Sequence, residues 1–286
     1  MVKVEYHADL KEVQSDTGLA TLLGADAQVA PFDRLAWWQG LAAHCDLEPL
    51  LAVARNDSGA AVLPLSGSDG HLRALANWYS FRFRPIVSEG ADGAALLADI
   101  AGDLSNRAHR VTLSGLPDED GSASLIEAAF RQAGWLVSRE VCDTNHVLDV
   151  NARSYDAYLA ERPGKLRTTL KRKSGKVTVD VLNHFDAAVW DAYEAIYRES
   201  WKPEEGSPDF LRGFAEAEGA AGRLRLGIAR VEGEAVAAQM WTVEGGTAFI
   251  HKLAHRESAK PFSPGSVLSA ALFRHVIDVD RVGMVD

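Results

Sequence analysis

Apolar and polar residues alternate most regularly in the C-terminal part of the chain. Arg223–Val231 places apolar side chains at alternate positions, and two further apolar runs occupy Ala235–Val243 and Thr247–Ala254. Such runs are typical of β-strands, and the turn residues Glu232-Gly233-Glu234 and Gly245-Gly246 separate them. The pattern therefore predicts a three-stranded antiparallel meander.

A helix is predicted after this meander, beyond a loop at Arg256–Phe262. Its apolar side chains recur at helical spacing: Val267, Leu268, Ala271, Leu272 and Val276. Ser263 is a favourable N-cap, because its hydroxyl can accept a hydrogen bond from a free amide of the first turn. Pro264 suits the first helical position, where its missing N–H is not needed. The apolar run Val282–Val285 is predicted to form a strand after the helix.

The first half of the chain shows a weaker version of the same order. Helices are predicted over Phe32–His44, Ala94–Asn106 and Ser122–Ala133, and strands over Pro49–Arg55, Ala60–Leu65, Leu72–Leu75, Arg110–Ser114 and Trp135–Glu140. The second half opens with predicted helices over Tyr155–Lys173, interrupted at Pro163-Gly164, and Ala187–Ser200, with a strand over Lys176–Leu182 between them. The repeated order predicts an α/β fold of two similar domains, residues 1–150 and 151–286, joined near Asp149–Ser154.

The composition is that of a folded protein. With 286 residues, 47% of them hydrophobic, the chain is long enough for two cores. No apolar stretch could span a bilayer, and the N-terminus lacks the hydrophobic segment of a secretory signal. Cys45 and Cys142 match no metal or redox spacing. We therefore expect a cytoplasmic protein without a transmembrane segment; nothing in the pattern indicates an oligomeric state.

The net charge of −10 is unevenly distributed. Arg162–Lys176 holds seven basic side chains and no acid, so the rest of the chain carries −17 once these seven charges are removed from −10. An acidic surface repels a polyanion, so DNA is not an expected partner. The basic segment leaves a local contact with an anion, including tRNA, open; the alternative is a solvated helix face or pairing with the other domain.

The helix start at Ser263 suits a phosphate group. Free amides of the first turn and the helix dipole both favour an anion there. Gly265 has no Cβ, so a phosphate can approach the main chain closely, and Lys260 can add positive charge. The structural alternative is an ordinary capped helix.

A meander that leads into a phosphate-binding helix and then a parallel strand resembles the core of GNAT acyltransferases. The family signature for the CoA pyrophosphate is Arg/Gln-x-x-Gly-x-Gly/Ala, and the corresponding stretch here is Lys260-x-x-Ser263-x-Gly265. The resemblance implies acetyl-CoA or another acyl-CoA as cofactor. Phosphate contacts would come from Lys260, Ser263, Gly265 and Ser266, and the pantetheine arm would align along Leu253, Ala254 and His255.

Three further stretches resemble the acetyltransferase-like domain of cellulose-biosynthesis (CelD/BcsL) proteins. They are the basic helix Tyr158–Lys173, the aromatic-basic segment Tyr197–Lys202, and Phe249–Ala254 with the Pro-Gly helix start after it. The likeness extends from about Asp149 to the end of the chain, and the first half is compatible with a degenerate GNAT-like domain. FemAB-type aminoacyl transferases have a similar two-domain architecture. By this resemblance the second domain is expected to be incomplete at its C-terminus.

The reaction implied by the resemblance is attack of an amine on a thioester held in the same cleft. His251 is the first candidate for the general base and Glu199 the second. A hydrogen-bonded structural role is the alternative for His251. On an ideal strand Lys252 would face the opposite side of the sheet from His251.

Candidate substrate contacts come from Trp201, Trp241 and Arg172. Each has a structural alternative, because tryptophans are usually buried in a core and charged runs are usually solvated. Pro203–Pro208 is rich in turn residues and is a candidate substrate flap. No metal site is expected, since a strand would place His251 and His255 about 13 Å apart.

Two other functions compete with an acyl-CoA-dependent N-acyltransferase that acts on a small-molecule or glycan amine. One is a FemAB-type transferase that uses aminoacyl-tRNA, in which the basic helix would contact RNA. The other is a non-catalytic accessory protein of exopolysaccharide production.

Overall fold

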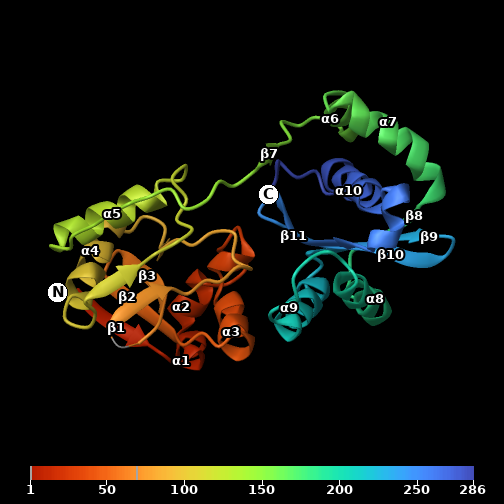
Figure 1. Cartoon of the computed structure of the whole chain (residues 1–286). Helices are drawn as coiled ribbons and strands as arrows, with labels where there is room; N and C mark the ends of the chain where they lie inside the picture. Colours follow the sequence, from red (N-terminus) through yellow and green to blue (C-terminus); the bar gives the residue numbers. More distant parts are fainter. Residues whose placement is uncertain (1, 69) are drawn as a thin grey trace. The chain divides into compact units, whose positions relative to one another are not determined.

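The computed structural model describes residues 2–68 and 70–286. The chain divides into two compact units, Met1–Asn145 and His146–Asp286 (Figure 1). Each unit contains one mixed six-stranded sheet flanked by helices. The predicted fold class, two α/β units with largely antiparallel sheets, is confirmed.

The sheet of the first unit has the strand order β1-β2-β3-β4-β6, with β5 paired to β3. All neighbours are antiparallel except β4 and β6, which are parallel. The strands are β1 (Lys3–His7), β2 (Pro49–Asn56), β3 (Gly59–Ser66), β4 (His71–Ala74), β5 (Ile86–Val87) and β6 (Arg110–Thr112). The helices are α1 (Leu10–Ser15), α2 (Thr17–Leu22), the 3-10 turn η1 (Pro31–Asp33), α3 (Leu35–His44), α4 (Gly93–Leu104) and α5 (Ser122–Gln132).

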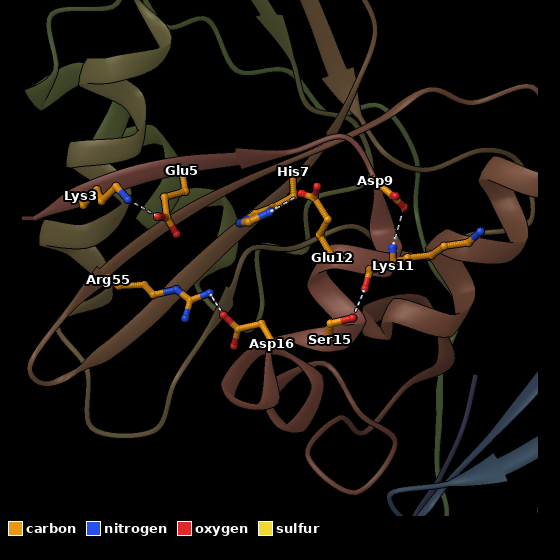
Figure 2. A network of polar contacts seen from close by, with 9 residues as sticks. All are labelled: Lys3, Glu5, His7, Asp9, Lys11, Glu12, Ser15, Asp16 and Arg55. Carbon is orange, nitrogen blue, oxygen red and sulfur yellow. Dashed lines mark hydrogen bonds and ion pairs between the residues drawn. The ribbon is translucent and has the colours of Figure 1, made fainter.

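The N-terminal elements β1, α1 and α2 have no counterpart in the sequence prediction. Asp9 caps α1 through the amide of Lys11, at 2.8 Å, and Asp16 caps α2 through the amide of Leu19, at 2.9 Å. Asp16 also forms an ion pair of 2.6 Å with Arg55 on β2 (Figure 2). Two short helices are therefore fixed by their aspartate caps and by polar links to the sheet, Asp16 to Arg55 and Glu12 to His7, rather than by a long apolar periodicity.

The predicted strand at Trp135–Glu140 is wrong: these residues form no strand. Single hydrogen bonds, rather than a ladder with a neighbouring strand, attach them to the unit, among them one of 3.0 Å from the Trp135 backbone amide to the Phe130 carbonyl. The Trp135 indole N–H donates to the Ala101 carbonyl at 2.8 Å, and Arg131 donates to the Val137 carbonyl at 3.2 Å. Leu136 is fully exposed, while Trp135 and Val137 are partly buried against the core, so the alternation is present although no described strand pairs with this segment.

The sheet of the second unit has the order β7-β12-β11-β10-β9-β8, with β11 and β12 parallel. The strands are β7 (Leu148–Asp149), β8 (Thr178–Leu182), β9 (Leu224–Val231), β10 (Glu234–Glu244), β11 (Thr247–His255) and β12 (Met284–Val285). The predicted meander and final strand are therefore present. Because β7 pairs with β12, the division between the units falls shortly before the predicted boundary at residue 150.

Helices cover both faces of this second sheet. On one face lie α8 (Ala187–Arg198) and α9 (Pro208–Ala220), and on the other α7 (Gly164–Lys173) and α10 (Pro264–Arg274) (Figure 1). The remaining helical elements are α6 (Tyr155–Ala160) and the turns η2 (Ser174–Lys176), η3 (Glu257–Phe262) and the π-helical η4 (His275–Val279). Gly227 on β9 permits the close packing of α10, because a Cβ there would lie 2.9 Å from Leu268 and from Leu272.

Candidate active site

The start of α10 differs from the predicted cap. Ser263 has φ 53° and ψ 45°, a left-handed conformation, and its side chain makes no capping hydrogen bond. The reason is that η3 runs directly into α10. The Ser263 N–H closes η3 on the Lys260 carbonyl at 3.0 Å, while its carbonyl accepts from Val267 at 3.1 Å. The predicted capping role of the Ser263 hydroxyl is therefore wrong, although the helix starts where it was predicted.

The conformation of Ser263 explains the glycine of the GNAT signature. A left-handed conformation suits glycine, and it is strained for a residue with a Cβ. Ser263 occupies the position where the signature has its first glycine. The serine therefore keeps the backbone turn without the residue type that adopts it most easily.

Replacing Ser263 by glycine is expected to stabilise the second unit by about 1 kcal/mol, because strain is relieved and no capping bond is lost. The matched control is Ser154→Gly. Ser154 does cap its helix, accepting from Ala157 at 3.3 Å, so that change is expected to destabilise by a few tenths of a kcal/mol. Urea denaturation of the two variants measures the difference, and equal effects would contradict the assignment.

The first amides of α10 are available to a ligand. In the part of the chain that the structure describes, no protein group accepts a hydrogen bond from the amides of Gly265 and Ser266. The side chain of Gln239 on β10 holds the helix start in place. This buried amide donates to the Gly265 carbonyl at 3.2 Å and to the Ser269 hydroxyl at 2.8 Å, and it accepts from the Trp241 indole at 2.9 Å.

Space beside Gly265 is open. A Cβ at this position would meet only the His255 ring, at 3.7 Å from Nδ1, which is an ordinary contact. His255 therefore lies next to the helix start. Lys260 forms an exposed ion pair with Glu257 at 2.5 Å, so its charge is shared with a carboxylate near the predicted phosphate position.

Among the residues that the structure describes, none pairs with the outer edge of β11 at its end, next to this helix start. β12 pairs with Thr247 and Ala248, and the last bond along this edge runs from the Ile250 amide to the Asp286 carbonyl at 2.8 Å. Beyond it, alternation in the antiparallel ladder directs the backbone of Ala254 to β10. The N–H and C=O groups of Leu253 and His255 therefore point to the open edge. Of the predicted pantetheine contacts, Ala254 contributes no free backbone group.

A β-bulge at His251 changes the direction of two side chains. Met240 pairs with Lys252 but Trp241 pairs with Ile250, so His251 is the extra residue. As a result both His251 and Lys252 face the helices α8 and α9, and the prediction that they lie on opposite faces is wrong. A bulge re-aims side chains in this way, and bulges are frequent beside active sites.

Contacts on this face confirm the direction of His251 and Lys252. His251 Nε2 lies 2.8 Å from the Thr242 hydroxyl, and its ring meets Phe214 of α9 edge-on at 5.1 Å. Lys252 Nζ lies 2.8 Å from the Glu205 carboxylate, and both of these side chains are largely buried, with 13% and 14% exposed. The bulge thus places an imidazole and a buried ion pair on one face.

A pocket of about 550 Å³ opens beside this ion pair, between α8, the following loop and α9. It is lined by Trp190, Tyr193, Glu194, Tyr197, Arg198, Lys202, Pro203, Glu204, Glu205, Pro208 and Leu211. Burial, reinforced by the Glu205 carboxylate, raises the pKa of Tyr197. Burial, and then the charge of Lys252, lowers the pKa of Lys202. This volume suits a small molecule.

The other predicted site residues are dispersed. Glu199 lies 3.4 Å from Arg256 in an ion pair and is about half exposed. Trp201 is 64% exposed, in the loop beside Lys202. Trp241 is completely buried and packs edge-on against Phe273 at 5.1 Å, so the prediction that it lines a substrate cleft is wrong.

Arg172 lies in the exposed last turn of α7. The strand after α7 is β8, and it begins with Thr178. Thr178 pairs with Arg230 on β9, and Arg230 pairs with Ala235 on β10. This row of residues lies at the end of the sheet where β11 ends, since His255 pairs with Ala237. The basic end of α7 and the start of α10 are therefore at the same end of the sheet.

Sequence reasoning missed the residues that form the pocket. Lys202, Glu205 and Tyr197 fall in segments that it singled out only as an aromatic-basic stretch and a flap, and Lys252 was assigned to the wrong face. The helix α9 was not predicted at all, although Pro208 at its first turn is a start signal.

Comparison with known proteins supports the fold. Residues 164–286 match the family model described as an acetyltransferase (GNAT) domain. L-PGS from Bacillus licheniformis is 14% identical, with a TM-score of 0.58, over 97% of this chain and 75% of that one. FemX is 9% identical, with a TM-score of 0.63, over 99% and 88% of the two chains. A tandem GNAT protein from the clavulanic acid biosynthesis pathway is 15% identical, with a TM-score of 0.52, over 99% and 89%.

The structural likeness establishes a tandem GNAT-like fold, and at these sequence identities it does not identify a substrate. No curated protein sequence matches the chain significantly. Among residues 2–68 and 70–286, no helix has both the length and the hydropathy of a membrane span. Within the same residues, no group of three or more His, Cys, Asp or Glu side chains is arranged to hold a metal ion.

Proposed function

We propose that the chain is an acyl-CoA-dependent N-acyltransferase, with acetyl-CoA or another acyl-CoA bound by the second unit. One observation carries the proposal: the open edge of β11 at Leu253 and His255 leads to the free amides of Gly265 and Ser266. The edge can align the amide groups of a pantetheine arm, and the helix start can bind a pyrophosphate. Two adjacent elements thus fit one extended ligand.

The acceptor amine would enter from the other face, through the pocket between α8 and α9. When bound, acyl-CoA supplies a thioester carbonyl: the amine nitrogen forms the new C–N bond, the C–S bond breaks, and the thiolate leaves. The chain must orient the amine and remove its proton. His251 is the proposed base, because the bulge directs it to this face and Thr242 fixes its ring. Glu199 remains the second candidate; its ion pair with Arg256 leaves it less available.

The outer contacts of the proposed site come from two exposed residues. Trp201 lies in the loop at the pocket and would cover part of the acceptor. Arg172, at the end of the sheet where α10 begins, would contribute positive charge toward the phosphates. The resemblance to CelD/BcsL proteins favours a sugar or envelope-related amine as acceptor, in the cytoplasm.

Thiol release in the presence of acetyl-CoA and a panel of small amines and amino sugars tests the function. We expect release that depends on an amine, and an acylated product detected by mass spectrometry. Release that is the same without any amine, or no acylated product across the panel, would contradict the proposal.

A transferase that uses aminoacyl-tRNA is the second candidate. The observation that favours it is α7, which has no buried residue and ends in Lys171, Arg172 and Lys173, together with the structural likeness to FemX. It predicts transfer from a charged tRNA and no thiol release from acetyl-CoA. Its binding to tRNA would weaken steeply with salt.

A further inference from the structure

The pocket between α8 and α9 is lined by three carboxylates and two basic side chains, and the two basic side chains form no ion pair among the described residues. Two of its carboxylates already face cations: Glu205 is paired with Lys252, and Glu194 accepts from the Trp190 indole at 2.8 Å and lies 3.8 Å from Arg212. The third, Glu204, is exposed.

Two cations also line the pocket, Arg198 and Lys202. In the described part of the chain, neither has a carboxylate within ion-pair distance. Arg198 donates only a long hydrogen bond, 3.4 Å, to the carbonyl of Glu194. Arg198 is exposed, so most of its guanidinium donors are open to solvent or to a ligand.

Lys202 is held in an environment that favours an anion. Its ammonium lies 5.9 Å from the ring centres of both Tyr197 and Trp201, and it is partly buried. Burial and then the charge of Lys252 lower the pKa of Lys202, and the Glu205 carboxylate opposes this shift only in part. An anion in the pocket would offset both effects.

The rest of the pocket is apolar. Trp190, Tyr193, Pro208 and Leu211 contribute aromatic and aliphatic surface. A volume of about 550 Å³ accommodates a molecule of metabolite size, and the ion pair of Lys252 links the pocket to β11.

We propose that this pocket binds the acceptor through an acidic group, a carboxylate or a phosphate, held by Lys202 and Arg198. That the ligand is an acceptor amine rests on the proposed function; that it is an anion rests on the pocket alone. The substrate class is therefore a small amine that carries an acidic group at its other end, such as an amino acid or an amino sugar phosphate.

Binding is tested without CoA, by calorimetric titration of the full chain with two pairs of probes. The first pair is amino acids and the corresponding amino acid amides, and the second is glucosamine 6-phosphate and glucosamine. We expect at least one acidic probe to bind about tenfold or more tightly than the counterpart that lacks the acidic group. A difference within the amino acid pair identifies a carboxylate as the recognised group, and a difference within the glucosamine pair identifies a phosphate. Equal affinity within every pair, or no binding of any acidic probe, would overturn the proposal.

Three variants locate the interaction. Lys202→Met and Arg198→Met are each expected to weaken the acidic probe about tenfold, while Lys202→Arg retains binding. The matched control is Lys11→Met, which removes the same charge from an exposed position on α1 of the first unit. Loss of affinity in the control, or unchanged affinity in Lys202→Met and Arg198→Met, contradicts the site.

The two proposals fail separately. Binding of acidic probes without any acyl transfer from acetyl-CoA would support the pocket and contradict the proposed function. Acyl transfer to amines irrespective of an acidic group would support the proposed function and contradict recognition of an acidic group by the pocket.

Discussion

Replacing Gly265 by valine is expected to weaken the binding of CoA by about 10- to 100-fold, the range of a lost hydrogen bond to a charged group. Two branches on Cβ would occupy the space through which a phosphate reaches the amides of Gly265 and Ser266. The fold should be retained, because a Cβ here meets only the His255 ring, 3.7 Å away, and the helical backbone needs no glycine.

The matched control is Gly213→Val, in the helix α9 of the same unit. A Cβ at Gly213 meets nothing within 4 Å, so the substitution introduces the same side chain into a helix without touching the proposed phosphate site. Calorimetric titration with CoA compares the two variants with the unaltered chain. If both variants bind CoA with the affinity of the unaltered chain, the helix start is not the phosphate site.

Removing one partner of the Lys252–Glu205 pair is expected to destabilise the second unit by about 2–4 kcal/mol, because the other charge stays largely buried without its partner. Glu205→Gln leaves Lys252 and Lys202 facing each other, and Lys252→Met leaves the carboxylate of Glu205 in the pocket wall. The double variant is expected to cost less than the sum of the single variants, since it leaves no unpaired charge in the pair.

The Arg230–Asp180 pair on the edge of the same sheet provides the comparison. Its side chains are 31% and 56% exposed, so Asp180→Asn is expected to cost less than about 1 kcal/mol. Urea denaturation, fitted to the transition of the second unit, gives the free energies of unfolding. Additive effects of Glu205→Gln and Lys252→Met would show that the pair is not coupled.

The elements with a strong period were predictable. The meander from β9 to β11, the helix α10 and the strand β12 follow from alternation, turn residues and the Ser-Pro start. The absence of a strand at Trp135–Glu140 was not predictable, because an alternating pattern does not show whether a partner strand exists. The short helices α1 and α2 have little periodicity and depend on Asp9 and Asp16.

The helix start of the candidate site was predictable and the pocket was not. Local order along the chain is enough to place Gly265 at a helix start. The pocket depends instead on how α8, the following loop and α9 pack, and no local signal marks either this packing or the bulge at His251 that brings Lys252 to Glu205. The bulge lets Lys252 reach Glu205, so the prediction that Lys252 faces away from His251 was wrong. Trp241, on β10, is buried against Phe273 of α10, a tertiary contact that the sequence did not indicate.

The central claim is that the start of α10 binds the pyrophosphate of an acyl-CoA whose arm runs along β11. Calorimetric titration of the full chain with CoA and, separately, with pantetheine tests it most directly, because the two differ in the nucleotide and its phosphates. We expect CoA to bind and pantetheine to bind at least about tenfold more weakly, since it lacks the charged group that the helix start would hold. Equal affinities for the two, or no heat of binding with CoA at millimolar concentration, would contradict the assignment.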